Sequence, residues 1–209
     1  MVYYHPDLAS VVLGRTEIDS APGSFRYNNY NPPLLGLILR RTTKMSVSEY
    51  FEQKIWQPLG ARWPAGWTVD MHDMERIESG FHARARDLAR FGMLYLNHGR
   101  VDDRQVLPEN WIIDSTDTAS HIELEQYDGR HWGYRAGWWI VPRPEGRSDY
   151  VAIGHFGQFI YVSPQFATVI VRNGPGRGDW GDRDWTELFY FIAESIGKAD
   201  RIERPAINR

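Results

Sequence analysis

The sequence predicts an α+β fold, in which several helices are followed by an antiparallel sheet and one last helix. Through the first part of the chain, apolar residues recur at helical spacing and are bounded by cap signals. After about residue 130 the pattern changes to short aromatic and β-branched runs that are typical of strands. We therefore expect a mostly helical region at 1–130 and a sheet with a C-terminal helix at 131–209, both parts of one domain.

The first region contains four predicted helices. One begins with Asn31 as the N-cap, has proline at its first helical position, and continues through a leucine-rich run. A second opens with the capping box at 46–49 and closes near Gly60. A third spans the run "ARARDLARFGMLYLNHG" at 83–99 and ends at its last glycine, and a shorter one covers 108–115.

The second region contains four predicted strands, at 134–141, 149–156, 158–163 and 166–173. The last two flank Pro164-Gln165, so we expect them to form a hairpin and the set to form a meander. A loop rich in glycine and aspartate, at 174–184, then leads into a final helix from about Trp185 to Ile196.

The composition excludes several classes of protein. The chain of 209 residues is 42% hydrophobic and 24% charged, which is typical of a globular domain. A net charge of −3 gives no footprint for nucleic acid, and no apolar run is long enough to span a membrane. The first ten residues are not a signal peptide, and the sequence does not indicate a compartment. With no cysteine, a nucleophile would be serine, threonine or a carboxylate.

Two short stretches carry candidate chemistry. Tyr27 and Asn29 stand two residues apart just before the leucine-rich helix. His155 and Gly157 lie where one predicted strand gives way to the next, and Gln158 follows. A glycine at such a place lets a substrate approach the backbone, while the amide of Gln158 is placed to meet a developing oxyanion.

In this order the motifs resemble the serine β-lactamase-like hydrolases, specifically the class C and D,D-peptidase-like branch that includes esterases and 6-aminohexanoate-dimer hydrolases. The stretches "PGSFRYNNYNPPLLGLILRR", "SGFHARARDLARFGMLYLNHGR", "WGYRAGWW" and "GHFGQFIYVSP" carry the resemblance, which covers about residues 20 to 197. It implies a β-lactamase/transpeptidase-like fold without its N-terminal part. It also implies acyl transfer to a serine, no cofactor or metal, and small amide, ester or peptide substrates.

The resemblance also implies roles for individual residues. Tyr27 matches the tyrosine that helps to activate the serine and to protonate the leaving group, and Asn29 matches the asparagine that orients the substrate. His155, Phe156 and Gly157 match the third motif of the family, and the backbone amide of Gln158 matches one oxyanion-hole donor. Many relatives have lysine in place of His155, which puts β-lactamase activity itself in doubt and favours amide, ester or peptide substrates.

Two further expectations concern neighbouring residues. Because Trp138 and Trp139 alternate along a strand, we expect one ring in the core and the other along a substrate cleft. Phe156 and Trp138 are the residues assigned to line the substrate. The acidic residues and histidines of the run "MHDMERIESGFH" (71–82) match no standard metal-ligand spacing, so we expect no metal there.

The family's nucleophile motif, Ser-x-x-Lys at the start of a helix, is the missing element. Of the three lysines, only Lys198 has a serine three residues before it, at Ser195. We exclude this pair because Gly197 reads as the end of the final helix. We therefore expect the C-terminal part of a longer hydrolase, inactive alone and prone to aggregate. The alternative is a non-catalytic protein that binds peptides or cell-wall fragments on the same scaffold.

Overall fold

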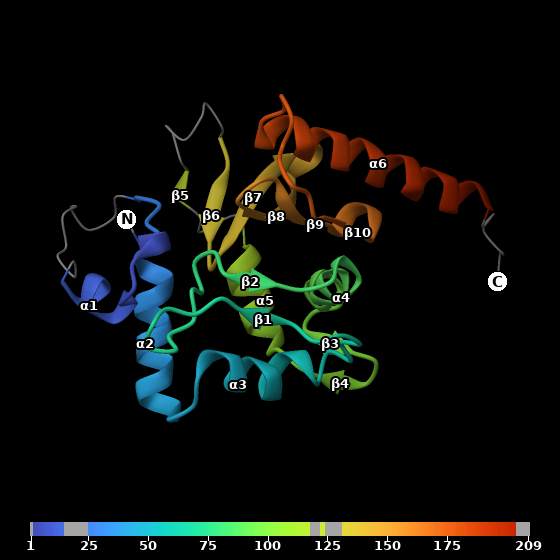
Figure 1. Ribbon diagram of the computed structural model, residues 1–209. Helices are drawn as coiled ribbons and strands as arrows, with labels where there is room; N and C mark the ends of the chain where they lie inside the picture. The colour runs from blue at the N-terminus through green and yellow to red at the C-terminus, as the bar shows by residue number, and fades with distance from the viewer. Residues whose placement is uncertain (1, 15–24, 118–121, 124–130, 204–209) are drawn as a thin grey trace. The chain divides into compact units, whose positions relative to one another are not determined.

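The structure is a computed structural model that describes residues 2–14, 25–117, 122–123 and 131–203, without the side chains of 122–123 and 200–203. The chain separates into two compact units, residues 1–84 and 85–209, each of which is described by itself (Figure 1). The predicted helical region is divided between the two units. Its helices after residue 84 belong to the second unit, because they pack on the sheet of that unit. Within the described residues, no helix is both long and apolar enough to cross a membrane.

The first unit is built mainly from short helices. These are η1 (Val2–Tyr4), α1 (Leu8–Leu13), α2 (Asn31–Thr43), α3 (Val47–Phe51) and the π-helical turn η2 (Glu52–Trp56). β1 (Gly66–Trp67) pairs antiparallel with β2 (Phe81–His82). Leu34 and Leu37 on α2 pack against the buried side chains of α1 and its neighbours, namely Val2, Leu8, Val12 and Met74. This core fixes α2, the helix that follows the Tyr27 motif.

The predicted capping box is confirmed, whereas the N-cap of α2 is Tyr30, one residue before the predicted Asn31. Ser46 accepts from the Glu49 amide at 3.1 Å, and the Glu49 carboxylate accepts from the Ser46 amide at 2.8 Å. By contrast, α2 begins at Asn31 itself, and its N-cap residue Tyr30 makes no side-chain cap bond. Asn28 provides the local organisation instead, because its Oδ1 accepts from the Tyr30 amide at 2.9 Å.

The second unit is a sheet covered by helices on both faces. Its helices are α4 (Ala85–Leu96), α5 (Glu109–Thr116) and α6 (Asp182–Glu203). Six strands follow one another in the antiparallel order β10-β9-β8-β7-β6-β5. Their bounds are Ile122–Glu123 for β5, Gly133–Arg135 for β6, Trp138–Arg143 for β7, Arg147–Gly154 for β8, Gln158–Ser163 for β9 and Thr168–Arg172 for β10. The predicted meander and its last hairpin are confirmed. A small separate hairpin joins β3 (Arg100–Val101) to β4 (Arg104–Gln105).

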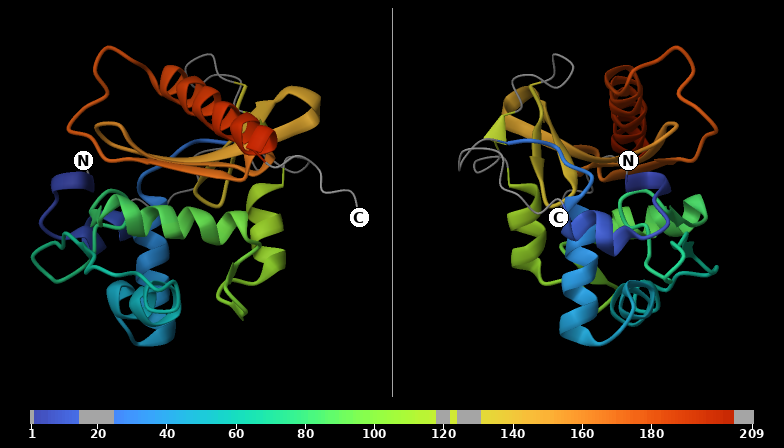
Figure 2. Two further views of the ribbon diagram at one scale, coloured as in Figure 1. Left: turned by 90° about the vertical axis from the view of Figure 1, so that its right-hand side faces the viewer. Right: turned by 60° about the vertical axis from the view of Figure 1, so that its left-hand side comes forward.

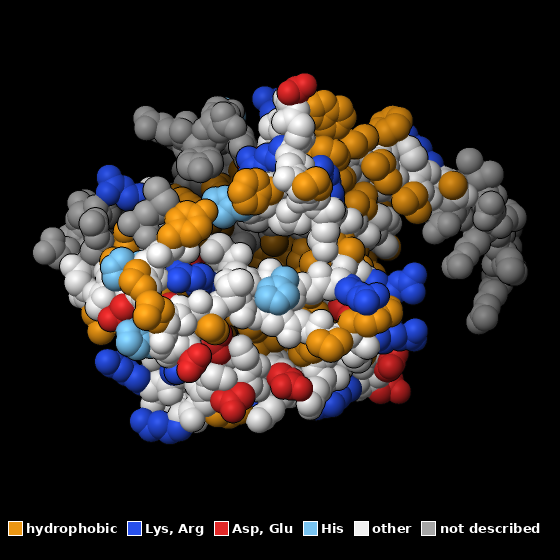
Figure 3. Space-filling view, viewed as in Figure 1, with side chains coloured by type: hydrophobic (Ala, Val, Ile, Leu, Met, Phe, Trp, Pro, Cys, Tyr) orange, Lys and Arg blue, Asp and Glu red, His pale blue; other side chains and the backbone are white. Residues whose placement is uncertain are grey.

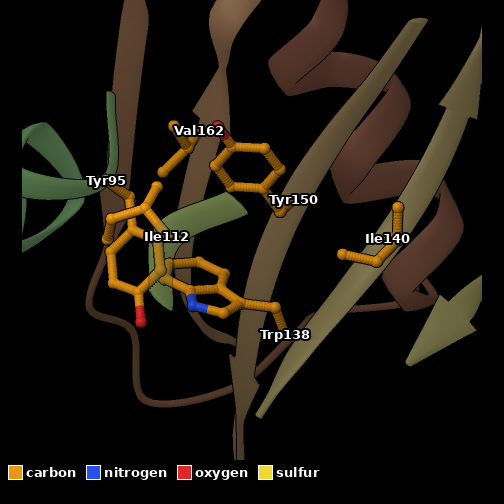
Figure 4. Close-up of a cluster of buried hydrophobic side chains, with 6 residues drawn as sticks. All are labelled: Tyr95, Ile112, Trp138, Ile140, Tyr150 and Val162. Atoms are coloured by element: carbon orange, nitrogen blue, oxygen red, sulfur yellow. The ribbon is translucent and has the colours of Figure 1, made fainter. Parts of the chain in front are cut away.

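Helices α4 and α6 lie on opposite faces of this sheet (Figure 2). On the α4 face, the core cluster gathers aromatic and branched side chains from α4, α5 and the strands: Tyr95, Ile112, Trp138, Ile140, Tyr150 and Val162 (Figure 4). Gly92 allows α4 to come close, because a Cβ there would lie 2.6 Å from Cγ1 of Val169. On the α6 face, Phe159 and Tyr161 contact the ring of Phe189.

Three predicted boundaries in this unit are wrong. The run 134–141 is not one strand, because Ala136 and Gly137 both have positive φ (48° and 91°) and turn the chain from β6 into β7. The strand predicted at 149–156 ends at Gly154. The final helix starts at Asp182 and runs through Gly197 to Glu203. Packing of α6 on the sheet outweighs the weak helix propensity of one glycine.

Candidate functional site

Tyr27 and Asn29 lie in the segment that enters α2, within the first unit. Residues 25–28 have no regular structure, and residues 29 and 30 form a turn that leads directly into the helix. The Tyr27 side chain is 38% exposed. The motif therefore stands at a helix entrance whose backbone is set by the Asn28 side chain, as described above.

His155, Phe156 and Gly157 form the tight turn between β8 and β9, within the second unit. Gly154 and Gln158 are register partners on either side of the turn. Phe156 and Gly157 both have positive φ, 59° and 76°, so the chain reverses within three residues. The Phe156 ring is 70% exposed, and its centroid lies 6.1 Å from that of His155. The predicted position of this motif, between two strands, is confirmed.

Gln158 follows this turn and is the first residue of β9. Gly154 and Gln158 are register partners on either side of a loop of three residues. The side chain of Gln158, for which the sequence predicted no role, is held in place. Oε1 accepts from the Gly174 amide at 3.0 Å, and Nε2 donates to the Gly174 carbonyl.

Trp138 lies in the core of the second unit. Its ring is 3% exposed and packs edge-on against Tyr95, with centroids 4.7 Å apart. Trp139 points to the other face of the strand but is also buried, at 6% exposure. Both faces of the sheet are covered at this point, so the alternation of the strand does not bring either ring to the surface. This burial does not support the assignment of Trp138 as a substrate-lining residue.

Ser195 and Lys198 lie within α6, so the reason for excluding them changes. The helix does not end at Gly197, and the two residues are one turn apart. However, the Ser195 hydroxyl donates to the Phe191 carbonyl at 2.8 Å, and Lys198 pairs with Glu194 at 3.0 Å. The serine is thus bonded back to its own helix and the lysine is neutralised by a carboxylate, which does not favour a nucleophile and its base.

No group of three or more potential metal ligands forms within the part of the chain that the structure describes. In the run 71–82, the Glu75 carboxylate accepts from the Ser48 amide at 2.9 Å. His82 Nδ1 lies 3.2 Å from the Gly80 carbonyl, and His72 lies 4.0 Å from Asp7. These side chains are directed to different neighbours.

Sequence reasoning missed Arg172, the last residue of β10. Its guanidinium donates to the carbonyl of Gly157 in the β8–β9 turn and to the carbonyl of Gly176 at 2.7 Å. The signal in the sequence is an arginine at the end of a strand followed by the glycine-rich run "NGPGRG". Glycines of this kind leave space for a neighbouring side chain, but the sequence does not say which one.

Comparisons with known proteins agree with this fold. A family model described as Beta-lactamase matches residues 5–188. A 6-aminohexanoate-dimer hydrolase of Paenarthrobacter ureafaciens is 28% identical over 189 residues, which are 87% of this chain and 46% of that protein. A structure from Bacillus anthracis, assigned as a 6-aminohexanoate-dimer hydrolase, is 30% identical with a TM-score of 0.77, covering 87% of this chain and 47% of the other.

A structure from Bacteroides dorei assigned as a beta-lactamase shares the fold at 18% identity, with a TM-score of 0.68 over 92% of this chain and 66% of that one. The chain thus spans about half the length of the 6-aminohexanoate-dimer hydrolases that it matches.

Proposed function

Since the chain belongs to the beta-lactamase family, we propose that it is the C-terminal portion of a serine hydrolase that cleaves amide or ester bonds. The family match across 5–188 carries the proposal, because both candidate motifs fall within it. Two relatives named as 6-aminohexanoate-dimer hydrolases, whose printed substrate contains an amide, support an amide as the scissile bond.

The reaction we propose is acyl transfer in two steps. A serine oxygen, supplied from outside this chain, adds to the substrate carbonyl, and the bond to the leaving amine or alcohol breaks. The phenol of Tyr27 relays the proton from the serine to the leaving group, and Asn29 orients the substrate amide. Water then attacks the ester of the acyl-enzyme, which releases the acid and returns the proton to the serine.

Within this proposal the turn at 155–157 faces the substrate. The ring nitrogens of His155 offer a hydrogen bond to the substrate. The exposed ring of Phe156 offers an apolar contact to the acyl chain, and Gly157 keeps the turn narrow. The backbone amide of Gln158 remains one of the two proposed oxyanion donors.

Labelling with a fluorophosphonate, and reading the DNA upstream of the Met1 codon, test the proposal together. We expect no covalent labelling of the 209-residue chain. We also expect an in-frame upstream extension that encodes Ser-x-x-Lys, and labelling of the extended protein on that serine. In the extended protein, Tyr27→Phe should lower the hydrolysis of a p-nitrophenyl ester by about 10²- to 10⁴-fold. Tyr4→Phe, at a tyrosine that is 84% exposed, is the matched control and should leave the rate unchanged.

Two outcomes contradict the proposal. Labelling of the 209-residue chain itself would place a nucleophile within it. A promoter and a stop codon immediately upstream would instead favour the second candidate, a non-catalytic protein that binds peptides or cell-wall fragments. The arrangement of Ser195 and Lys198 described above supports the first expectation, since neither group is presented as a nucleophile or its base.

A further inference from the structure

One arginine joins the β8–β9 turn to the glycine-rich loop at 174–178. Arg172 donates through Nη1 to the Gly157 carbonyl and through Nη2 to the Gly176 carbonyl, the latter at 2.7 Å. Its guanidinium carbon lies 4.1 Å from the centre of the Trp185 ring on α6. The planar fork of an arginine suits this double contact, because its two nitrogens reach two acceptors at once.

The Gln158 side chain makes a second bridge between the same two segments. Its carbonyl oxygen accepts from the Gly174 amide and its nitrogen donates to the Gly174 carbonyl. Both backbone groups of Gly174 are therefore bonded to one side chain. We call the side chains of Arg172 and Gln158, with their contacts to the turn and the loop, the clamp.

Two glycines make room for the clamp. A Cβ on Gly157 would lie 2.6 Å from Nη1 of Arg172, and a Cβ on Gly174 would lie 2.7 Å from its Cζ. Such distances are below normal contact, so a side chain at either position would push the guanidinium away. The glycine in the turn and the glycine in the loop thus both leave space for the guanidinium of Arg172.

The clamp fixes the orientation of one peptide group in the turn. In a trans peptide the carbonyl and the amide point in opposite directions. Arg172 holds the carbonyl of Gly157, so the following amide, that of Gln158, points the opposite way. The turn that carries His155 and Phe156 is therefore held at the carbonyl of its C-terminal peptide group.

We propose that Arg172 and the Gln158 side chain are positioning residues, which make the turn at 155–157 and the loop at 174–178 one rigid body. A rigid turn in turn fixes the positions of His155 and Phe156. This inference rests on the proposed function in one respect, namely that the turn faces the substrate there. The existence of the clamp is independent of that function.

Hydrogen–deuterium exchange of the 209-residue chain tests the clamp. We expect Arg172→Lys to accelerate exchange at least about tenfold in peptides that cover 154–158 and 174–178, with β7 unchanged, because an ammonium lacks the fork. Gln158→Glu should act in the same way, since its carboxylate cannot donate to the Gly174 carbonyl. Arg183→Lys, at an exposed arginine of α6, is the matched control and should change neither peptide. Unchanged exchange in both clamp variants, or uniform acceleration throughout the sheet, would overturn the inference.

A kinetic measurement on the extended hydrolase tests the positioning role. Arg172→Lys should lower kcat about tenfold or more and leave KM within about twofold, as expected when geometry rather than binding is lost. If exchange accelerates but kcat stays the same, the clamp is structural only and the positioning role is wrong. If the extended protein has no activity with Arg172 intact, the proposed function fails, and the exchange result still decides the clamp.

Discussion

At the scale of single residues, buried polar side chains tie the sheet of the second unit to α6. Asp149 is 1% exposed and accepts from Nε of Arg143 at 2.7 Å and from the Tyr161 hydroxyl at 2.5 Å. Arg143 also donates to Glu187 on α6 at 2.8 Å. Each buried charge thus has a hydrogen-bonded partner, as burial requires. Burial together with the Asp149 carboxylate raises the pKa of Tyr161 well above its ordinary value.

Tyr150 gives a prediction for alkaline pH. Burial, with smaller effects of the Asp149 carboxylate and Tyr95, raises the pKa of Tyr150 to about 12. In the unfolded chain a tyrosine loses its proton near pH ~10. Between these two values the unfolded state binds fewer protons than the folded state, so stability falls as the pH rises. The contribution of Tyr150 to the unfolding free energy is fully present below pH ~10. Up to about 3 kcal/mol of this contribution is lost by pH ~12.

Urea unfolding at several alkaline pH values measures this effect. Tyr150→Phe should flatten the decline of unfolding free energy by up to about 1.4 kcal/mol per pH unit above pH ~10. For Tyr4→Phe, at an exposed tyrosine, the unfolding free energy should decline with rising pH as it does for the wild type. Identical slopes for the wild type and Tyr150→Phe would show that Tyr150 does not keep its proton in the folded state.

At the scale of elements, turns decide where the strands of the sheet begin and end. Arg135 pairs with Trp138 across the turn at Ala136-Gly137. A left-handed alanine is strained, whereas glycine is not. The sequence pattern shows a continuous aromatic run here, and only the backbone reveals the reversal. The turn at 155–157 works in the same way, with a glycine following a strained Phe156.

The first of these turns gives a prediction for stability. Ala136→Asn should raise the unfolding free energy by about 0.5–1 kcal/mol, because asparagine tolerates positive φ and Asn-Gly is the preferred pair for a two-residue hairpin. Urea denaturation at neutral pH measures the change. Ala136→Val is the contrasting variant and should destabilise, because a β-branched residue is strained at positive φ. A stabilising valine would mean that the turn does not keep this backbone conformation in solution.

At the scale of the whole molecule, the second unit has an edge strand, β10, and exposed apolar side chains on α6. β10 is the last strand of the sheet order, with β9 as its partner in the part of the chain that the structure describes. On α6, Phe191 is 63% exposed and Ile196 is 47% exposed. Figure 3 shows hydrophobic side chains gathered over this helix, at the upper right. Strand edges and apolar surface of this kind favour association between copies of a chain.

We therefore expect the isolated 209-residue chain to be poorly soluble. Replacing Phe191 and Ile196 together by lysine should raise the concentration of soluble protein several-fold with little change in unfolding free energy, since both side chains face solvent. Ala199→Lys adds charge at an exposed position of the same helix without removing apolar surface, and should help less. Sedimentation and size-exclusion chromatography measure the outcome. A soluble wild-type monomer with one sharp, cooperative melt would contradict the expectation.

Local sequence signals determined much of this protein. The capping box at Ser46, the periodicity of α4 and the strand pattern of the meander predicted their elements because each depends on neighbours along the chain. The two candidate motifs are also short local stretches of sequence. The structure places one before α2 and the other between β8 and β9.

Tertiary contacts decided the rest. Gly197 continues α6 because the helix packs on the sheet, and a Cβ there would lie 3.0 Å from the ring of Phe166. Trp138 is a core residue because α4 covers its face of the sheet. The side chains of Gln158 and Arg172 join residues that are 16 and 15 positions apart, and no periodicity encodes such a pairing. A sequence specifies propensity locally, whereas burial and hydrogen-bond partners exist only after distant segments have met.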